Sequence, residues 1–168
     1  MAEHRDGGAS CGLHFAIVTV SDSRREEDDR SGATARRLVV EAGHQVVAAR
    51  IVPDETDSIR EAVEAFLAAP AGDVLLLTGG TGIAPRDVTP EAVAPLFERE
   101  LPGFGEAFRW LSFAEIGPAA MLSRAAGGVA RGRALFLLPG SPAAVELALT
   151  RLVLPEIGHL LAQARRRG

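Results

Sequence analysis

The 168-residue chain contains no lysine, no asparagine and no tyrosine, so all 18 of its basic residues are arginine. Codons for the three missing residues are A/T-rich, and their absence therefore indicates a GC-rich, bacterial genome. The missing lysine also excludes some chemistry. A Walker-A ATP loop, a Schiff base and a pyridoxal-phosphate attachment all need a lysine side chain, and this chain can form none of them.

Cysteine is almost as scarce, since Cys11 is the only one. A single thiol cannot close an internal disulfide, which is typical of a reducing compartment, and we expect a cytoplasmic protein. There is no run of about 18 apolar residues that would predict a membrane span. Residues 1–13 lack the apolar stretch of a secretory signal. We therefore expect a flexible tail over 1–13, one domain over 14–168 and no membrane contact.

An excess of positive charge is also absent. The formal net charge of −4 argues against nonspecific nucleic-acid binding as the main role. The four histidines are scattered, and none stands at metal-binding spacing from another histidine or from the cysteine, so we expect no zinc or iron site.

Short apolar runs alternate with segments of helical periodicity along most of the chain. The apolar runs predict strands at 15–20, 46–52 and 73–78, and a hairpin of 128–130 with 134–138. The periodic segments predict helices from about 31, 57, 89 and 141, and over 102–113. Thr89 is expected to cap its helix, and Pro155 to break the last one. This alternation predicts a mostly parallel α/β sheet covered by helices on both faces.

Ligands of such sheets bind outside the carboxyl ends of the strands. The loops after Val20, Val52, Leu77 and Leu138 are therefore the candidates for a site. The strongest signal is the loop Thr78 to Asp87, which places three glycines within four residues directly after a buried strand. Backbone N–H groups of Gly79, Gly80, Thr81 and Gly82 could approach an anion closely there. A glycine-rich turn that merely joins strand to helix is the alternative.

Charged residues at the end of this loop favour a functional reading. Arg86 could clamp an oxyanion and Asp87 could hold Mg²⁺, which prefers carboxylate oxygens together with substrate phosphates. Asp54, at the end of the second predicted strand, is a second carboxylate on the same sheet edge. A surface Arg–Asp pair, a helix cap and a Pro–Asp turn are the structural alternatives.

Two further loops offer polar groups at the same edge. Ser21 and Asp22 could bind a ligand or cap a turn. The segment Pro139, Gly140, Ser141 and Pro142 could present N–H groups and a hydroxyl at a helix start, or Ser141 could be an ordinary cap. Ser141 is not in a G-x-S-x-G motif, so a hydrolase nucleophile is not supported.

Several of these segments, taken in order, resemble the MoaB/Mog family of molybdenum cofactor biosynthesis proteins, closest to its short MoaB-like type. The central match is GGTGIAPRDVTPE at 79–91. The other matching segments are TVSD at 19–22, IVPDE at 51–55, PGFGE at 102–106, LSR at 122–124 and LPGSP at 138–142. The resemblance extends over nearly the whole chain after residue 13, which makes the combination of segments far more specific than the glycine loop alone.

The resemblance implies a three-layer α/β/α fold that binds molybdopterin. Active members adenylylate the terminal phosphate of molybdopterin with Mg-ATP and release pyrophosphate. Asp54 and Asp87 match the two aspartates of the family, as catalytic residues and candidate Mg²⁺ ligands. The ligand-binding segments of the family correspond to Ser21, Ser123, the loop 79–82 and the loop 139–142.

The resemblance also implies a homotrimer, or a homohexamer for the short type, with transient contacts to other cofactor-biosynthesis enzymes. Two other functions stay open at this point. Some relatives bind the pterin without doing the chemistry, and outside the family a generic nucleotide-binding regulator would share the same loop. The presence of Asp54, Arg86 and Asp87 together favours the active enzyme.

Overall fold

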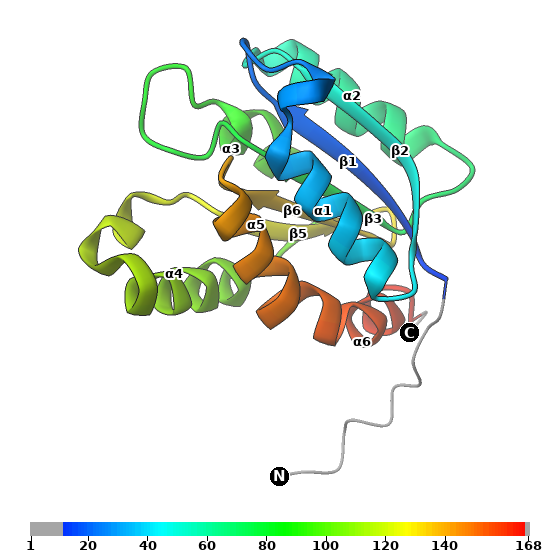
Figure 1. Cartoon of the computed structure of the whole chain (residues 1–168). Helices are drawn as coiled ribbons and strands as arrows, with labels where there is room; N and C mark the ends of the chain where they lie inside the picture. The colour runs from blue at the N-terminus through cyan, green and yellow to red at the C-terminus, as the bar shows by residue number, and fades with distance from the viewer. Residues whose placement is uncertain (1–11, 167–168) are drawn as a thin grey trace, which may run out of the picture.

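The computed structural model describes residues 12–166, in which six strands form one sheet of order β2-β1-β3-β6-β5-β4 (Figure 1). The neighbouring strands from β2 to β6 in this order pair in parallel, whereas β5 pairs antiparallel with both β6 and β4. The prediction of a mostly parallel sheet is therefore confirmed. The strands are β1 (His14–Val20), β2 (Gln45–Val52), β3 (Val74–Thr78), β4 (Arg99–Glu100), β5 (Ala126–Ala130) and β6 (Arg133–Leu138).

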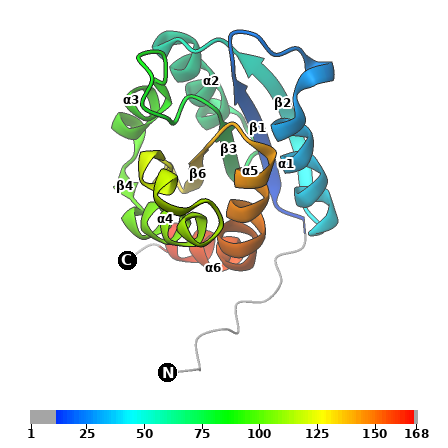
Figure 2. The ribbon, with the colours of Figure 1, turned by 60° about the vertical axis from the view of Figure 1, so that its left-hand side comes forward.

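Helices cover both faces of this sheet, which completes three layers. Figure 2 shows α1 and α5 on one side of the central strands and α2 on the other. The helices are α1 (Arg30–Glu41), α2 (Thr56–Ala68), α3 (Thr89–Val93), α4 (Pro102–Ile116), α5 (Pro142–Ala148) and α6 (Leu154–Ala164). None of the helices described is long and apolar enough to cross a membrane.

Strand β3 shows why the sheet is buried on both faces. Val74 and Leu76 pack into the cluster beneath α1, α5 and α6, while Leu75 and Leu77 pack into the cluster beneath α2 and α3. All four side chains are buried, because successive residues of a strand point to opposite faces and each face has its own layer of helices. The apolar run at 73–78 predicted this central position.

Two details differ from the prediction. Thr89 does not cap α3: it lies within that helix, fully buried, and its hydroxyl donates to the Gly79 carbonyl at 2.8 Å. The last helix is not broken at Pro155; a π-helical segment, Leu149–Val153, precedes that proline, and α6 then continues. A proline removes one backbone N–H, and a local change of helical pitch accommodates this loss without ending the helix.

The predicted tail lies mostly outside the described residues. Of its last two residues, Gly12 donates from its amide to Gly43 O at 3.2 Å, and Leu13 O accepts from Gln45 N at 2.9 Å. Strand β1 begins directly after them, at His14.

The order of the strands determines where a ligand can bind. Helix α1 connects β1 to β2 on one face of the sheet, and α2 connects β2 to β3 on the other face. The chain therefore changes direction between β1 and β3, and the loops that leave these strands separate. This gap at the carboxyl ends is where open α/β sheets bind ligands.

Candidate functional site

A cleft of about 460 Å³ lies at this edge, and all four candidate loops contribute to it. Ser21 follows β1, Asp54 follows β2, the glycine loop follows β3, and Pro139 follows β6. The cleft is lined by Val20, Ser21, Arg24, Asp54, Gly79, Gly80, Thr81, Gly82, Asp87, Leu122, Ser123, Pro139, Gly140 and Ser141. The sheet thus brings together segments separated by more than one hundred residues in the sequence.

The glycine loop is fixed against its neighbours and needs its glycines. Gly79 and Gly80 have φ angles of 109° and 64°, in the region that favours glycine. A β-carbon at Gly79 would collide with the Val20 carbonyl oxygen, and one at Gly80 would collide with the Thr89 hydroxyl. The loop therefore packs its backbone closely on β1 and α3, and its exposed side forms one wall of the cleft.

The carboxylates of Asp54 and Asp87 both face this loop. An oxygen of Asp54 lies 3.1 Å from the point that a β-carbon of Gly80 would occupy, and an oxygen of Asp87 lies 2.7 Å from the corresponding point at Gly82. The missing side chains leave room for both carboxylates. Asp87 also accepts a hydrogen bond from the Ala84 amide at 2.8 Å, which holds its side chain within the loop.

Negative charge accumulates around Asp54. Burial raises the pKa of the Asp54 carboxyl above its usual value, and the charges of Asp22 and Asp87 raise it further. Carboxylates that repel one another in this way are stabilised by a cation. Among the described residues no group of three or more His, Cys, Asp or Glu could hold a metal ion by itself. Asp54 and Asp87 could supply two carboxylate ligands to Mg²⁺, an ion that usually completes its coordination with water and ligand phosphates.

Three predicted site residues lie outside the lining of the cleft. Arg86 is 65% exposed and forms an ion pair with Asp22, with 2.5 Å between nitrogen and oxygen. Asp22 also accepts a hydrogen bond from the Asp54 amide at 3.0 Å, so it orients the chain at that aspartate. Pro142 is the first residue of α5, and Ser141 caps this helix by accepting from the Ala144 amide at 3.2 Å.

Two arginines at the site were not selected from the sequence. Arg24 lines the cleft directly. Arg124 binds the backbone of the glycine loop: its Nε donates to Gly82 O at 2.7 Å, and its Nη2 donates to Asp87 O at 2.5 Å. Local sequence does not distinguish these two from the other arginines, and only the LSR match at 122–124 pointed near Arg124.

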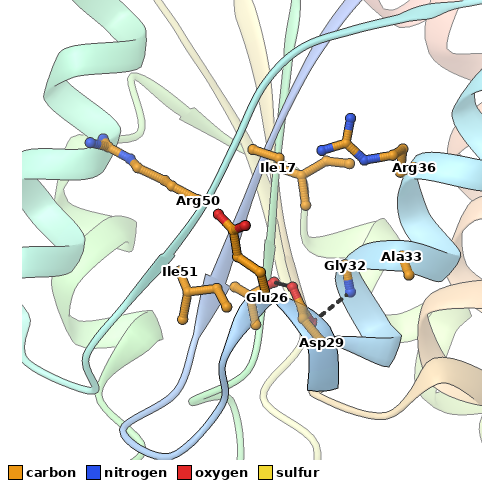
Figure 3. A pocket seen from close by; sticks show the side chains of 10 residues that line it. Ile17, Glu26, Asp29, Gly32, Ala33, Arg36, Arg50 and Ile51 are labelled. Carbon is orange, nitrogen blue, oxygen red and sulfur yellow. Dashed lines mark hydrogen bonds between the residues drawn. The ribbon is translucent and has the colours of Figure 1, made fainter.

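A second hollow, of about 280 Å³, lies between α1 and β2 (Figure 3). Its carboxylate Asp29 is already satisfied, because it accepts hydrogen bonds from the Thr19 hydroxyl at 2.6 Å and the Gly32 amide at 2.9 Å. In the same view the Arg36 side chain points toward Ile17, whereas the Arg50 side chain points away from the hollow. This hollow and the cleft share no lining residue, so they are separate.

The fold and the cleft together define a doubly wound α/β protein with a cleft at its switch point, the position at which such folds bind ligands. The family described as "Probable molybdopterin binding domain" matches residues 16–159. Molybdenum cofactor biosynthesis protein B of Bacillus subtilis (strain 168) is 49% identical over 151 residues, which are 89% of this chain and 89% of that protein.

Solved structures agree with this match. A crystal structure of molybdenum cofactor biosynthesis protein B superposes with a TM-score of 0.90 at 48% identity, covering 93% of this chain and 98% of the other. The tungsten cofactor synthesizing protein MoaB from Pyrococcus furiosus superposes with a TM-score of 0.79 at 37% identity, covering 92% and 98%.

The chain belongs to this molybdopterin-binding family, as its ordered motifs predicted. The resemblance to MoaB/Mog proteins and the three-layer α/β/α fold are both confirmed. The homologues support a role in molybdenum cofactor biosynthesis.

Proposed function

We propose that this protein transfers the adenylyl group of Mg-ATP to the terminal phosphate of molybdopterin and releases pyrophosphate. The observation that carries the proposal is the position of Asp54 and Asp87, which face one glycine loop across one cleft. Molybdopterin as the acceptor rests on the family to which the chain belongs.

The reaction needs no covalent intermediate on the protein. An oxygen of the molybdopterin phosphate attacks the α-phosphorus of ATP, and a new P–O bond forms. The bond from the α-phosphorus to the oxygen that bridges to the β-phosphorus breaks, and its electron pair leaves with pyrophosphate. Both reactants are anions, so the protein must align them and neutralise their charge.

Different residues of the cleft can align the reactants and neutralise their charge. The backbone amides of residues 80–82 and the hydroxyls of Ser21, Ser123 and Ser141 can donate hydrogen bonds to phosphate oxygens. Asp54 and Asp87 would hold Mg²⁺, which when bound would supply positive charge to the departing pyrophosphate. The bond from the Ala84 amide keeps the Asp87 carboxylate in place before the substrates arrive.

The test is pyrophosphate release from Mg-ATP, measured with and without molybdopterin. We expect release only when both are present, and a loss of about 10²–10³-fold in kcat for Asp87→Asn, as for the removal of other pre-positioned charge-stabilising groups. Asp28→Asn is the matched control, because Asp28 is exposed, lies outside the cleft and should retain full activity. Thermal unfolding of each variant establishes that the fold is intact.

The same assay separates the other two functions. Molybdopterin binding without pyrophosphate release would identify a pterin-binding or scaffolding protein. ATP binding that is indifferent to molybdopterin would identify a nucleotide-binding regulator. A fully active Asp87→Asn protein would refute the role of Asp87.

We also propose that the protein forms a homo-oligomer, a trimer or a hexamer, through an exposed apolar patch. This patch consists of Trp110, Phe113, Ile116 and Met121, on α4 and the 3₁₀ helix that follows it; Trp110 is 75% exposed and Met121 is 76% exposed. Large exposed apolar side chains gathered in one place are typical of subunit contacts. In Figure 1 this segment projects from one end of the molecule.

Light scattering after size-exclusion chromatography tests the oligomer. Trp110→Glu should lower the mass toward that of one chain. Val40→Glu, which places the same charge at an exposed apolar residue of α1, should leave the mass unchanged. A monomeric wild-type protein would refute this part of the proposal.

A further inference from the structure

Arg24 stands in the wall of the cleft and is held there by two other segments. Its Nη1 donates to the Ser31 hydroxyl at 2.7 Å, and its Nη2 donates to Gly140 O at 2.8 Å. These bonds connect the loop after β1 to the start of α1 and to the loop after β6. Only 33% of the Arg24 side chain is exposed. The guanidinium is therefore oriented before any ligand binds, which reduces the entropy lost on binding.

The charge of Arg24 is only weakly neutralised by its neighbours. The nearest carboxylate oxygen belongs to Asp29 and lies 3.9 Å from Nη1. Asp29 already accepts hydrogen bonds from the Gly32 amide and the Thr19 hydroxyl, which stabilise its negative charge independently of Arg24 (Figure 3). A guanidinium has more N–H donors than the two bonds occupy. Arg24 therefore retains both positive charge and donors for a ligand.

Arg24 is also the one arginine among the described residues that lines the cleft. The other charged residues of the lining are Asp54 and Asp87, which repel anions. Arg86 is mostly exposed, lies outside the lining and is paired with Asp22 at 2.5 Å. Arg24 is therefore the positively charged side chain of the cleft lining that a phosphate-bearing ligand would contact.

We propose that Arg24 binds a phosphate oxyanion of the substrates, a role that the sequence alone had suggested for Arg86. A planar guanidinium can donate two parallel hydrogen bonds to one phosphate, which gives orientation as well as charge. The inference rests on the proposed function to the extent that the ligands carry phosphate, but it does not depend on adenylyl transfer.

Binding of inorganic pyrophosphate, measured by calorimetry without pterin or ATP, tests this role. We expect Arg24→Gln to weaken pyrophosphate binding at least about tenfold, because one charge-assisted, two-bond contact is lost. Arg86→Gln should weaken it less than Arg24→Gln does. The matched control is Arg25→Gln, since Arg25 is adjacent and exposed and does not line the cleft, and its affinity should equal that of the wild type. Unchanged binding in Arg24→Gln, or a larger loss in Arg86→Gln, would overturn the proposal.

Thermal unfolding first establishes that each variant folds. If Arg24→Gln does not fold, Arg24→Lys carries the test, with an expected loss of about threefold because lysine keeps the charge but not the planar fork. Wild-type affinity in that variant would count against the proposal.

Kinetics then distinguish the source of the phosphate. A higher KM for ATP in the Arg24 variant places the ATP phosphates at Arg24, and a higher KM for molybdopterin places the pterin phosphate there. No change in either KM contradicts the proposal even if adenylyl transfer is established. Conversely, weaker pyrophosphate binding supports it even if no adenylyl transfer is found.

Discussion

Replacement of Arg124 by alanine should loosen the loop that carries Asp87. The Arg124 guanidinium donates to the carbonyl oxygens of Gly82, at 2.7 Å, and Asp87, at 2.5 Å, and it also pairs with Glu91 on α3. The Arg124 amide donates to Thr81 O at 2.9 Å, so the side chain and backbone of one residue hold the loop at its middle and at its end. Alanine keeps the backbone bond and removes the other three contacts.

The expected loss of stability follows from these contacts. A hydrogen bond from a charged donor contributes about 1.5–3 kcal/mol when it is shielded from water. The Arg124 side chain is 34% exposed, so water replaces part of what is lost. An exposed ion pair such as that with Glu91 contributes about 0–1 kcal/mol. We therefore expect the free energy of unfolding to fall by about 2–3 kcal/mol, which for a chain of this size lowers Tm by about 4–12 °C.

Activity should fall more than stability alone would require. A displacement of about 1 Å at a reacting group can reduce the rate about 10²-fold, because alignment is lost. We expect Arg124→Ala to reduce kcat at least about tenfold at a temperature where the variant remains folded. Its KM for ATP should change less, since Arg124 donates to loop carbonyls and does not line the cleft. The measurements are thermal unfolding and the kinetics of pyrophosphate release.

Two other variants separate the possible causes. Glu91→Gln removes only the ion pair, and its Tm and kcat should stay near the wild-type values. Arg131→Ala removes an exposed arginine that pairs with Glu64, far from the cleft, and should leave kcat unchanged. If Arg124→Ala keeps both the Tm and the kcat of the wild type, the loop does not depend on Arg124 and the reasoning is wrong.

Three further predictions concern charge and backbone geometry. The pKa of Asp54 is raised, chiefly by burial, so ionisation of Asp54 destabilises the folded state as pH rises from the ordinary aspartate pKa through the raised one. Asp54→Asn should therefore have a higher Tm than the wild type at pH 7 and should lose that advantage below about pH 3.8. The Tm of this variant should not respond to added Mg²⁺. For Asp73 burial alone would raise the pKa, but hydrogen bonds from the His14 amide and Arg165 lower it overall. Its stabilisation is present above the ordinary aspartate pKa and is lost as pH falls through the lowered one, so Asp73→Asn should lower Tm at pH 7 and not in strong acid; equal losses at both pH values would contradict this. Gly80→Ala should reduce both Tm and kcat, because Gly80 has positive φ and a β-carbon would meet the Thr89 hydroxyl; an unaffected variant would show that the loop can move.

Much of the fold followed from local patterns. The apolar run at 73–78 predicted a central strand, since only a strand covered on both faces is apolar at successive positions. The turn at Arg131 and Gly132, both with positive φ, joins β5 to β6 as the predicted hairpin. The misreading of Thr89 has a clear physical reason. A threonine before a proline resembles a helix cap, but here its hydroxyl donates to the Gly79 carbonyl across the loop instead of accepting from a helix amide.

The loops that line the cleft could be predicted, because the prediction requires only the ends of the strands and the rule that ligands bind outside their carboxyl ends. The arrangement of charges within the cleft could not. Arg86 and Asp87 are adjacent in the sequence, yet Arg86 pairs with Asp22 while Asp87 faces the glycine loop. Adjacent side chains of a loop can point in different directions, and backbone torsions that the whole fold imposes decide which one enters the cleft.

The sequence by itself thus determined the family and the layered fold, and it predicted that Asp54 and Asp87 lie at one edge of the sheet, because each of these inferences depends on residue types at short, ordered spacings. The tertiary structure alone decided which arginines lie at the cleft and contact its loops. Arg24 reaches Gly140 across 116 residues of sequence, and Arg124 reaches Gly82 across 42. Neither contact leaves a periodic or local signal, since it exists only where the folded sheet brings loops from distant strands to one edge.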